Sequence, residues 1–293
     1  MHFKYKKIDA FTSGNSKGNP AACLLLGNKK LTPAQMLDFG KEHAGFVSEV
    51  VFVENSSVAD CKLTYYSSEC EVDFCGHGTI ATMYELIKST PELLSKQEIT
   101  VETNRKGLLT VYNHIADENA VYITSPKGIR HSMTCTPEMI VEKLGISKDV
   151  CDASLPFAHI EAGLRTIIVP IKKLSDEISI WPNEQQLKEF AIAHNFDNVL
   201  VFSMETSNCN CIAHTRVFAP RFGYLEDPAT GSSNLAFAYY MLDQGLWNGK
   251  AATIEQGGNN RVFNSVRIMH HNGRILFGGG ATLKIEGVYN IND

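Results

Sequence analysis

Two short stretches of the sequence combine glycines with side chains that can bind ligands or transfer protons. The first is Asp73-Phe74-Cys75-Gly76-His77-Gly78-Thr79, and the second is Glu226-Asp227-Pro228-Ala229-Thr230-Gly231-Ser232. An apolar run follows each stretch, which predicts a loop leading into a helix buried on all sides. Gly76 and Gly231 carry no side chain, so a ligand carboxylate could approach the unpaired amides of each first helical turn. We therefore expect two helix starts that bind a small anion.

Three polar residues in these stretches have both a functional and a structural interpretation. His77 could act as a general acid or base, or could simply be a loop histidine. Asp227 precedes a proline, which favours an extended conformation just outside the helix. There it could face a ligand, or it could cap the turn by accepting a hydrogen bond from the Thr230 or Gly231 amide. Ser232 has the same two interpretations, because serine is a preferred helix cap.

Glu49 is a further candidate for proton transfer. It lies in an expected strand at about Phe46 to Glu54, in which both alternating faces are apolar. Such a strand is buried, and burial raises the pKa of a carboxyl group towards the range of a general base. The alternative is a glutamate at a strand end that faces water.

The cysteines raise two further possibilities. Cys75 is a plausible reactive thiol, but a racemase of the two-thiol type needs a second cysteine, and 227–234 contain none. Cys209, Cys211 and His214 are spaced like metal ligands, but on a strand the cysteines would point away from the histidine. No glycine-rich stretch matches a nucleotide-binding fingerprint. The residues therefore give no support for a nucleotide cofactor and little support for a metal.

Composition narrows the class of protein. The chain has 293 residues, of which 44% are hydrophobic, and a net charge of -5, so it has no basic footprint for nucleic acid or an anionic membrane. No apolar run reaches the roughly 18 residues of a membrane helix. The 8 cysteines are scattered and suit reduced thiols better than a disulfide framework. We expect a soluble cytoplasmic protein.

The order of the expected elements is similar in the two halves of the chain. Each half has strands, one of the two special loops, a buried helix and then more strands. Breaker residues near 125–128 predict the crossover. We therefore expect an α+β protein of two pseudo-symmetric domains, each a rolled, mostly antiparallel sheet around one helix. The first comprises residues 1–124 with a last strand at about 280–293, and the second comprises 125–279.

Six motifs in order resemble one known family. They are Gly18-Asn19-Pro20-Ala21, Ser48-Glu49, Glu71 to Thr79, Arg216 to Pro220, Glu226 to Ser232 and Glu255-Gln256-Gly257. Together they resemble the PhzF-type, phenazine-biosynthesis-like isomerases over nearly the whole chain. The resemblance implies a diaminopimelate-epimerase-like fold with the active site in the cleft between two domains. It also implies a homodimer that works without metal or organic cofactor.

The resemblance further implies residue roles. Well-understood members isomerise a dihydro-hydroxyanthranilate by moving a proton between carbons, with a glutamate as the acid/base, which here is Glu49. The catalytic histidine and aspartate fall on His77 and Asp227. The substrate-binding positions fall on Asn19, Gly76, Gly231 and Ser232. This implies an isomerase acting on a small carboxylated metabolite.

Departures from the family pattern leave the substrate open. Tyr66-Ser67-Ser68 stands where many members have Phe-Thr-Pro, Gly78 where many have alanine, and Arg261-Val262 where arginine-proline is common. Two alternatives to the isomerase also remain. One is a thiol-dependent racemase or epimerase that uses Cys75, and the other is a non-catalytic metabolite-binding protein.

Overall fold

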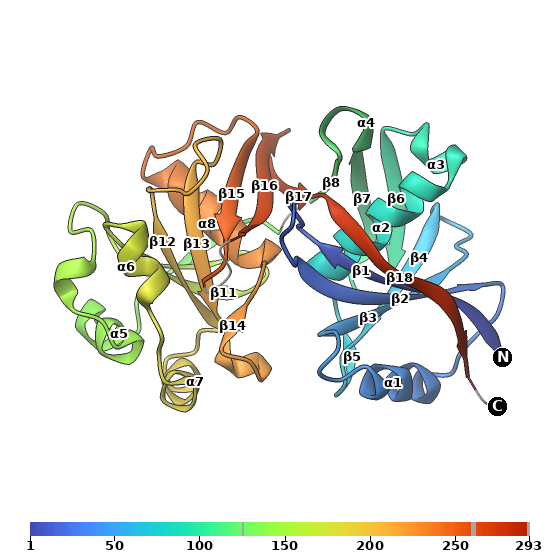
Figure 1. Ribbon diagram of the computed structural model, residues 1–293, viewed down its shortest axis with the longest axis horizontal. Coiled ribbons are helices and arrows are strands. Elements are labelled where there is room, and N and C mark those ends of the chain that lie inside the picture. Colours follow the sequence, from blue (N-terminus) through green and yellow to red (C-terminus); the bar gives the residue numbers. More distant parts are fainter. Residues whose placement is uncertain (125, 259–261, 292–293) are drawn as a thin grey trace. The chain divides into compact units, whose positions relative to one another are not determined.

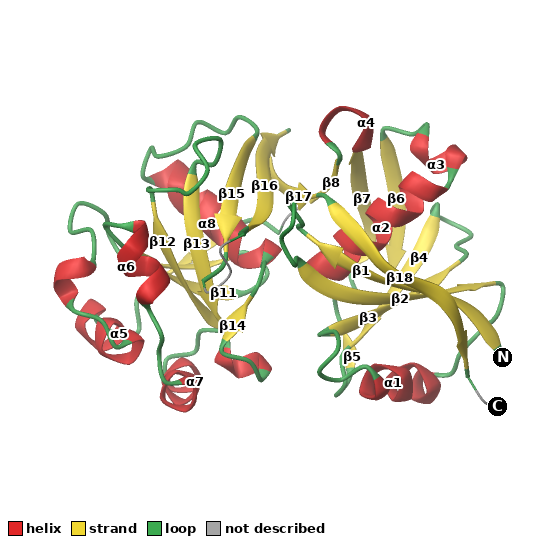
Figure 2. Ribbon diagram, viewed as in Figure 1, coloured by secondary structure: helices red, strands yellow, loops and turns green. Residues whose placement is uncertain are grey.

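A computed structural model describes residues 1–124, 126–258 and 262–291. The chain divides into two compact units. The first consists of Met1–Thr124 together with Gly278–Asp293, and the second of Ser125–Phe277. Figure 1 shows the chain in sequence colours, and Figure 2 shows that strands dominate in both units. The expected break at Ser125 and the expected Arg261 position lie outside the described residues.

The first unit is a sheet with one long helix against it. Its strands are β1 (His2–Ala10), β2 (Asn19–Gly27), β3 (Glu49–Glu54), β4 (Cys61–Tyr66), β5 (Glu71–Val72), β6 (Glu98–Thr103), β7 (Gly107–His114), β8 (Ala120–Thr124) and β18 (Ala281–Asn290). Its helices are α1 (Pro33–Glu42), α2 (Gly76–Ser89), α3 (Pro91–Leu94) and α4 (Ile115–Glu118). The strands pair in the order β18, β1, β2, β3, β4, β6, β7, β8, and β5 adds to β4. The pairs β2–β3 and β4–β6 are parallel, and the others are antiparallel.

Helix α2 occupies the interior of the first unit. It packs against β1, β2, β3, β8 and β18, which come from both ends of the sheet. Ile80, Met83 and Ile87 on it are completely buried, and Tyr84 is nearly so. The apolar character of the helix on all sides therefore follows from its position, because strands cover more than one side of it.

The second unit has its own sheet and long helix. Its strands are β9 (Ile129–His131), β10 (Ala158–Glu161), β11 (Arg165–Pro170), β12 (Asn198–Ser203), β13 (Ala213–Phe218), β14 (Glu226–Asp227), β15 (Ala252–Gln256), β16 (Asn264–His271) and β17 (Arg274–Gly279), which runs on into the first unit. Its helices are α5 (Pro137–Leu144), α6 (Leu174–Ser179), α7 (Glu184–Ala193) and α8 (Gly231–Asp243), with 3-10 turns at Lys148–Val150 and Pro220–Phe222. The strands pair in the order β9, β10, β11, β12, β13, β15, β16, and β14 adds to β13.

The two sheets share one succession of pairings. In the second unit β11–β12 and β13–β15 are parallel, as β2–β3 and β4–β6 are in the first. In each unit a two-residue strand, β5 or β14, pairs with the strand before it, and the long buried helix begins four residues later. This short pairing fixes the loop that leads into the helix.

The expected mix of helices and strands is confirmed, and two details of the expected elements are wrong. The strand expected from Phe46 begins only at Glu49, and Phe46 is 49% exposed in the preceding loop. Cys209 and Cys211 lie before β13, which begins at Ala213, so the directions expected for them on a strand do not apply. In the described part of the chain, none of the helices has the length and apolar character needed to cross a membrane.

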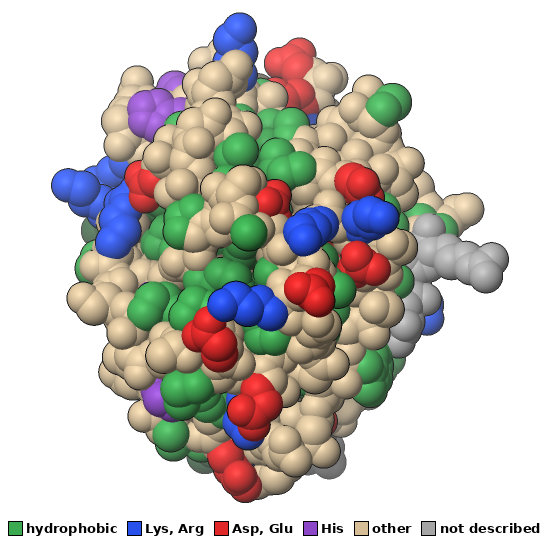
Figure 3. Space-filling view, turned by 90° about the vertical axis from the view of Figure 1, so that its left-hand side faces the viewer, with side chains coloured by type: hydrophobic (Ala, Val, Ile, Leu, Met, Phe, Trp, Pro, Cys, Tyr) green, Lys and Arg blue, Asp and Glu red, His purple; other side chains and the backbone are tan. Residues whose placement is uncertain are grey.

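Charged side chains are mixed on the surface. On the face shown in Figure 3, acidic and basic side chains are interspersed with apolar ones, without an area of one sign. Exposed ion pairs such as Lys148 with Glu138 and Arg130 with Asp243 keep opposite charges together. This face therefore lacks the continuous basic surface that nucleic acid binding needs.

Candidate active site

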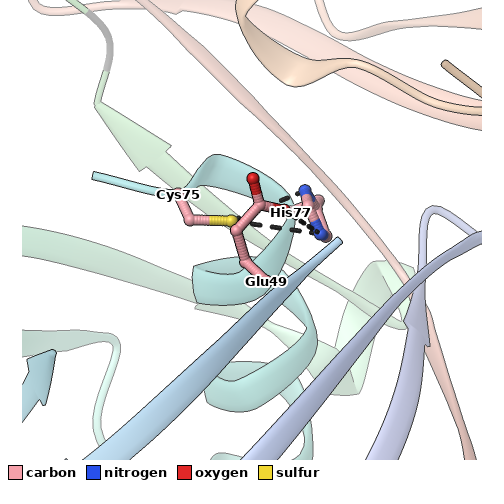
Figure 4. Close-up of side chains that lie close together, drawn as sticks. All are labelled: Glu49, Cys75 and His77. Atoms are coloured by element: carbon pink, nitrogen blue, oxygen red, sulfur yellow. Dashed lines mark hydrogen bonds and ion pairs between the residues drawn. The ribbon is translucent and has the colours of Figure 1, made fainter. Parts of the chain in front are cut away.

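Glu49 lies at the start of β3, beside the first turn of α2. It pairs in register with Ala21 of the parallel strand β2, so its backbone is held by the sheet. Oε2 of Glu49 lies 3.4 Å from Nε2 of His77 (Figure 4). The side chain of Glu49 is 22% exposed and that of His77 12% exposed, so both keep some access to solvent.

The surroundings of Glu49 change its acidity. Desolvation by burial raises its pKa from the ordinary value of 4.5 to about 7. Apart from the contact with His77, Oε2 of Glu49 accepts no hydrogen bond from the described residues. A carboxyl group with a pKa near neutrality can both take up and release a proton at neutral pH. Glu49 is thus partly buried, and its pKa is raised as expected, while its role in proton transfer stays a prediction.

The first turn of α2 is built around Cys75. Cys75 is the N-cap residue, and its Sγ accepts a hydrogen bond from the Gly78 amide at 3.3 Å. The same Sγ lies 3.5 Å from Nδ1 of His77. Tyr65 and Thr79 share a hydrogen bond of 2.8 Å, and Thr79 donates to the Cys75 carbonyl at 2.7 Å. The loop is thus fixed from both sides, and His77 is held between a thiol and a carboxyl group.

Glu49, Cys75 and His77 present three kinds of ligand atom in one place. Their ligand atoms all lie within 4.8 Å of one another. This spacing would allow a divalent cation such as Zn²⁺ to bind. A cation there would need the carboxylate and the thiolate as ligands, and its own charge would favour both deprotonated forms. Without a cation, the carboxyl group and the imidazole can exchange protons with a ligand at neutral pH.

Asn19 lies at the same end of the sheet as Glu49. It is the first residue of β2 and is 2% exposed. Two residues further along β2, Ala21 pairs with Glu49, so Asn19, Ala21 and Glu49 face the same side of the sheet. The expected contact of Asn19 with a substrate stays a prediction.

The second unit holds the other expected site residues around the start of α8. Asp227 lies in β14 and pairs with Val217, and its Oδ1 accepts a hydrogen bond from the Ala229 amide at 3.1 Å. The prediction that Asp227 accepts a hydrogen bond from the Thr230 or Gly231 amide is therefore wrong, because the donor is the Ala229 amide, one or two residues earlier in the chain. Thr230 is the N-cap, so Ser232 lies within the first turn and is not the cap. Gly231 begins the helix, as expected.

Gln256 holds the loop before α8, a role that its position in a Gln-Gly motif did not reveal. Its Oε1 accepts hydrogen bonds from the Thr230 amide at 2.9 Å and from Nδ2 of Asn234 at 2.6 Å. Its Nε2 donates to the Asp227 carbonyl at 2.8 Å and to Oγ1 of Thr230 at 3.2 Å. One fully buried side chain on β15 therefore connects β14 to the first turns of α8.

Arg216 is a second residue whose role the sequence did not reveal. It is completely buried, and Nε and Nη2 each donate to Glu226 at 2.9 Å. Its Nη1 donates to the carbonyls of Glu177, Ile178 and Ile180 at the end of α6. A Cβ at Gly258 would lie 2.4 Å from Nε of Arg216, so only glycine fits there. Arg216 thus ties α6 to the strand that carries Asp227.

Comparison with known proteins agrees with the motifs. A sequence model of the family described as "Phenazine biosynthesis-like protein" (PhzC-PhzF) matches residues 8–287. The chain belongs to this family. The match covers both units, including every expected site residue, and it confirms the resemblance seen in the sequence.

Individual relatives carry isomerase names. The chain is 31% identical over 255 residues to the "Uncharacterized isomerase YfhB" of Bacillus subtilis, covering 86% of this chain and 85% of that protein. It is 25% identical over 290 residues to the "Uncharacterized isomerase YddE" of Escherichia coli K12, covering 98% of this chain and 90% of that protein. The family and these relatives indicate an isomerase.

Solved structures show the same fold. A phenazine biosynthesis protein of the PhzF family from Bacillus anthracis has a TM-score of 0.86 at 25% identity, covering 99% of this chain and 100% of that one. A hydroxyproline epimerase from Agrobacterium vitis has a TM-score of 0.62 at 11% identity, covering 100% of this chain and 93% of that one. The second likeness concerns the fold alone.

Proposed function

We propose that this protein is a cofactor-independent isomerase that moves a proton between two carbons of a small carboxylated metabolite. The observation that carries the proposal is the contact of 3.4 Å between Glu49 and His77 at the start of α2, with the pKa of Glu49 raised to about 7. Such a group is suited to take a proton from carbon and return it within one turnover near neutral pH.

The proposed reaction conserves atoms and electrons. The Glu49 carboxylate takes a proton from an acidic C–H bond, and the electron pair of that bond moves into the conjugated system of the substrate. The protonated Glu49 then delivers the proton to another carbon of the same system. No oxidant or reductant is needed, and His77 stabilises the charge on Glu49 through its Nε2.

Substrate binding is the second part of the proposal. The amides at the starts of α2 and α8 suit a carboxylate, because the positive ends of helix dipoles attract anions. Gly76, Gly231 and Ser232 supply backbone groups in these first turns. The family resemblance adds Asp227 as a catalytic residue that polarises or orients the substrate, and Asn19 as a substrate contact. It also adds the pseudo-symmetry of the two units and a homodimer. These remain predictions, as do the cytoplasmic location and the absence of a metal.

Deuterium incorporation tests the chemistry even when the substrate has not been identified. The wild-type protein is incubated in heavy water with a mixture of small carboxylated metabolites, and mass spectrometry with chromatography follows each compound. Isomerisation changes the retention time, and exchange at carbon adds deuterium. We expect Glu49→Gln to lower the rate about 10²–10⁴-fold, the usual contribution of general acid/base catalysis.

Glu54→Gln is the matched control. Glu54 ends the same strand that Glu49 begins, so its substitution changes a carboxyl group on β3 without touching His77. Near-normal turnover by a folded Glu49→Gln protein would refute the proposal. Treatment with a chelator should leave the rate unchanged; a rate restored only by added metal would assign a cation to the Glu49, Cys75 and His77 group instead.

A thiol-dependent epimerase is a second candidate, because Sγ of Cys75 lies 3.5 Å from Nδ1 of His77. In that reaction the Cys75 thiolate would take the proton from a stereocentre, and alkylating agents would inactivate the protein. Cys75→Ala separates the two functions. Full activity in this variant removes the thiol mechanism, and loss of activity with retained folding supports it.

A further inference from the structure

The thiol of Cys75 lies beside the pair of Glu49 and His77 but has no part in the proton transfer proposed for that pair. Its Sγ lies 3.5 Å from Nδ1 and 3.9 Å from Nε2 of His77, and Cys75 is 5% exposed. Thiolate, imidazole and carboxylate are the side-chain groups that bind zinc in proteins. The three residues therefore have the composition of a zinc site as well as that of an acid/base pair.

The ligand atoms of the three residues are close to the spacing that a zinc ion requires. A tetrahedral ion binds sulfur at about 2.3 Å and nitrogen or oxygen at about 2.0–2.2 Å, which places the ligand atoms about 3.4–3.6 Å from one another. Nε2 of His77 lies 3.4 Å from Oε2 of Glu49 and 3.9 Å from Sγ of Cys75. One ligand atom from each residue lies within 4.8 Å of the other two (Figure 4). Closing the largest separation around an ion therefore needs a side-chain movement of about 1 Å.

The backbone of all three residues is fixed by the fold. Glu49 pairs with Ala21 at the start of β3, while Cys75 is the N-cap of α2 and His77 lies in its first turn. The Cys75 carbonyl accepts hydrogen bonds from the Thr79 hydroxyl at 2.7 Å and from the Thr79 amide at 3.0 Å. Ligands carried by rigid elements need little ordering when an ion binds. Rotation of side chains is therefore enough to bind an ion here.

Solvent reaches the three residues through Glu49 and His77. The two side chains are 22% and 12% exposed. This exposure gives an ion a route to the ligand atoms. Zinc sites with three protein ligands keep a fourth position for water, whereas structural sites are closed by four protein ligands. The arrangement therefore suits an ion that exchanges with the solution.

The types of ligand select among divalent cations. A thiolate is a soft ligand that favours Zn²⁺, whereas Mg²⁺ and Ca²⁺ favour sites made of oxygen atoms. The thiolate of Cys75 and the carboxylate of Glu49 together balance the charge of Zn²⁺ in a partly buried place. Binding releases the thiol proton, and the Glu49 proton where it is present, to the solvent, and no electron is transferred. These ligands therefore suit zinc better than magnesium or calcium.

We propose that Glu49, Cys75 and His77 form an inhibitory site for Zn²⁺. The ion takes Oε2 of Glu49 and Nε2 of His77 as ligands, so neither group is available for proton transfer while it is bound. Removal of the ion restores activity. The inhibition rests on the proposed function, because it requires Glu49 to carry the proton, whereas the binding of zinc does not. Zinc thus uses the thiol that proton transfer leaves unused.

The first experiment measures binding and needs no substrate. The full chain is freed of metal, and Zn²⁺ is titrated in competition with a coloured zinc chelator. Co²⁺ serves as a spectroscopic probe, because a bond between cobalt and a thiolate absorbs in the near ultraviolet. We expect the wild type to bind one ion per chain. Loss of a residue that only supports a metal ligand costs about 10–100-fold in affinity, so Cys75→Ser should weaken zinc binding more than about tenfold and abolish the cobalt band.

Matched variants separate this site from other thiols and carboxylates. Cys75→Ser keeps a residue that can accept from the Gly78 amide, because serine is a preferred N-cap, so the helix start stays intact. Cys70→Ala removes an exposed thiol elsewhere, and Glu54→Gln changes the other end of β3. Both should bind zinc like the wild type, whereas Glu49→Gln should bind it more weakly. Zinc affinity and a cobalt band that survive in Cys75→Ser, or a band lost in Cys70→Ala alone, would overturn the site.

The second experiment measures inhibition by the rate of deuterium incorporation with and without Zn²⁺. We expect the wild-type rate to fall as the site fills and to recover when a chelator is added, and Mg²⁺ to have no effect. Relative to its own zinc-free rate, Cys75→Ser should need more than about tenfold more zinc for half inhibition. A rate that rises with zinc, or half inhibition at the same zinc concentration in both proteins, would overturn the inhibitory site.

The two proposals can fail separately. If Glu49→Gln stays active while zinc binding depends on Cys75, the metal-binding site stands, and the acid/base assignment falls together with the inhibition that it explains. If Glu49→Gln is inactive while zinc binding is independent of Cys75, the acid/base assignment stands and the metal site falls.

Discussion

The loops that lead into α2 and α8 have similar backbone structures, but the side chains around them differ. At α2 the N-cap thiol of Cys75 accepts from Gly78, and an ionisable pair, Glu49 and His77, lies beside the turn. At α8 the side chain of the N-cap residue Thr230 accepts no hydrogen bond from the helix amides. The neutral, buried Asn198 begins the second strand of a parallel pair, as Glu49 does in the other sheet. In the proposed function, the pair that transfers protons therefore lies at the start of α2, and the start of α8 contributes groups that bind and orient the substrate.

The two starts are also held differently. The loop before α8 depends on a side chain from a neighbouring strand, Gln256, which makes four hydrogen bonds to it and to α8. The loop before α2 depends on its own cap thiol and on one hydrogen bond to a neighbouring strand, between Thr79 and Tyr65 of β4. Substitutions at equivalent points of the two loops should therefore have unequal effects on the free energy of unfolding.

The largest effect on stability is expected for Gln256→Leu. It leaves the Thr230 amide, the Asn234 amide group and the Asp227 carbonyl without their buried partner. At the lower end of about 1–3 kcal/mol for each of these three groups, we expect the free energy of unfolding to fall by at least about 3 kcal/mol. Urea denaturation measures this, with the exposed Gln185→Leu as control. A loss below about 1 kcal/mol, the net contribution of a single hydrogen bond, would mean that the α8 loop does not depend on Gln256.

The next prediction concerns the dependence of stability on pH, which arises from Glu49 beside the start of α2. Because folding raises the pKa of Glu49 from 4.5 to about 7, the native state binds the proton more tightly than the unfolded chain. The contribution of Glu49 to stability therefore falls as pH rises from about 4.5 to about 7, by about 3 kcal/mol in all. Glu49→Gln removes this dependence and should be the more stable protein at about pH 8, above the raised pKa. Parallel stability curves of the two proteins between about pH 5 and pH 8 would contradict the raised pKa.

A pair of glycine substitutions compares the space at each helix start. A Cβ on Gly231 would lie 2.2 Å from the buried ring of Phe277, so Gly231→Ala should cost about 1–3 kcal/mol by overpacking. A Cβ on Gly78 would lie 2.9 Å from a methyl of the buried Val51 and 3.0 Å from Sγ of Cys75, a milder overlap than at Gly231, and alanine is the better helix former, which offsets part of its cost. We expect Gly78→Ala to change stability by less than about 1 kcal/mol. Thermal unfolding of both variants tests the contrast, and equal losses would contradict it.

The smallest effect is expected for Cys75→Ala. It removes the hydrogen bond that the Gly78 amide donates to the cap thiol, and the loss of a helix cap costs about 1 kcal/mol. Chemical denaturation measures the loss, and Cys61→Ala, a buried cysteine on β4, provides a comparison of cavity effects. A loss above about 3 kcal/mol, more than a cap provides, would show that the thiol holds more than its own turn.

The sequence predicted the elements that follow regular periodicity and the residues that lie in short motifs. The two buried helices, their glycine starts and the strand carrying Glu49 could be read from local patterns. The family resemblance added the roles of His77, Asp227 and Asn19, which remain predictions. Local patterns suffice here because capping, burial and alternation act over a few residues.

The residues that the sequence did not reveal act over long separations. Gln256 bonds to a loop more than twenty residues earlier, and Arg216 reaches the carbonyls at the end of α6. The sequence spacing of His214 from Cys209 and Cys211 resembled that of metal ligands. In the structure, Nδ1 of His214 lies 3.0 Å from Oε1 of Glu177 in the interior of the second unit. Burial there lowers the pKa of His214 to about 4. Such partners depend on which strands become neighbours, and single-residue patterns carry no information about that.

The pairing of β18 with β1 has a consequence for biosynthesis. β18 is translated after the whole of the second unit, yet it pairs with β1 along the full length of that strand and packs on α2. A nascent chain therefore carries a first sheet with one edge of β1 uncovered while residues 125–277 are completed. The second unit can fold on the ribosome as a continuous segment, whereas closure of the first must wait, because its last contacts are the most distant in sequence.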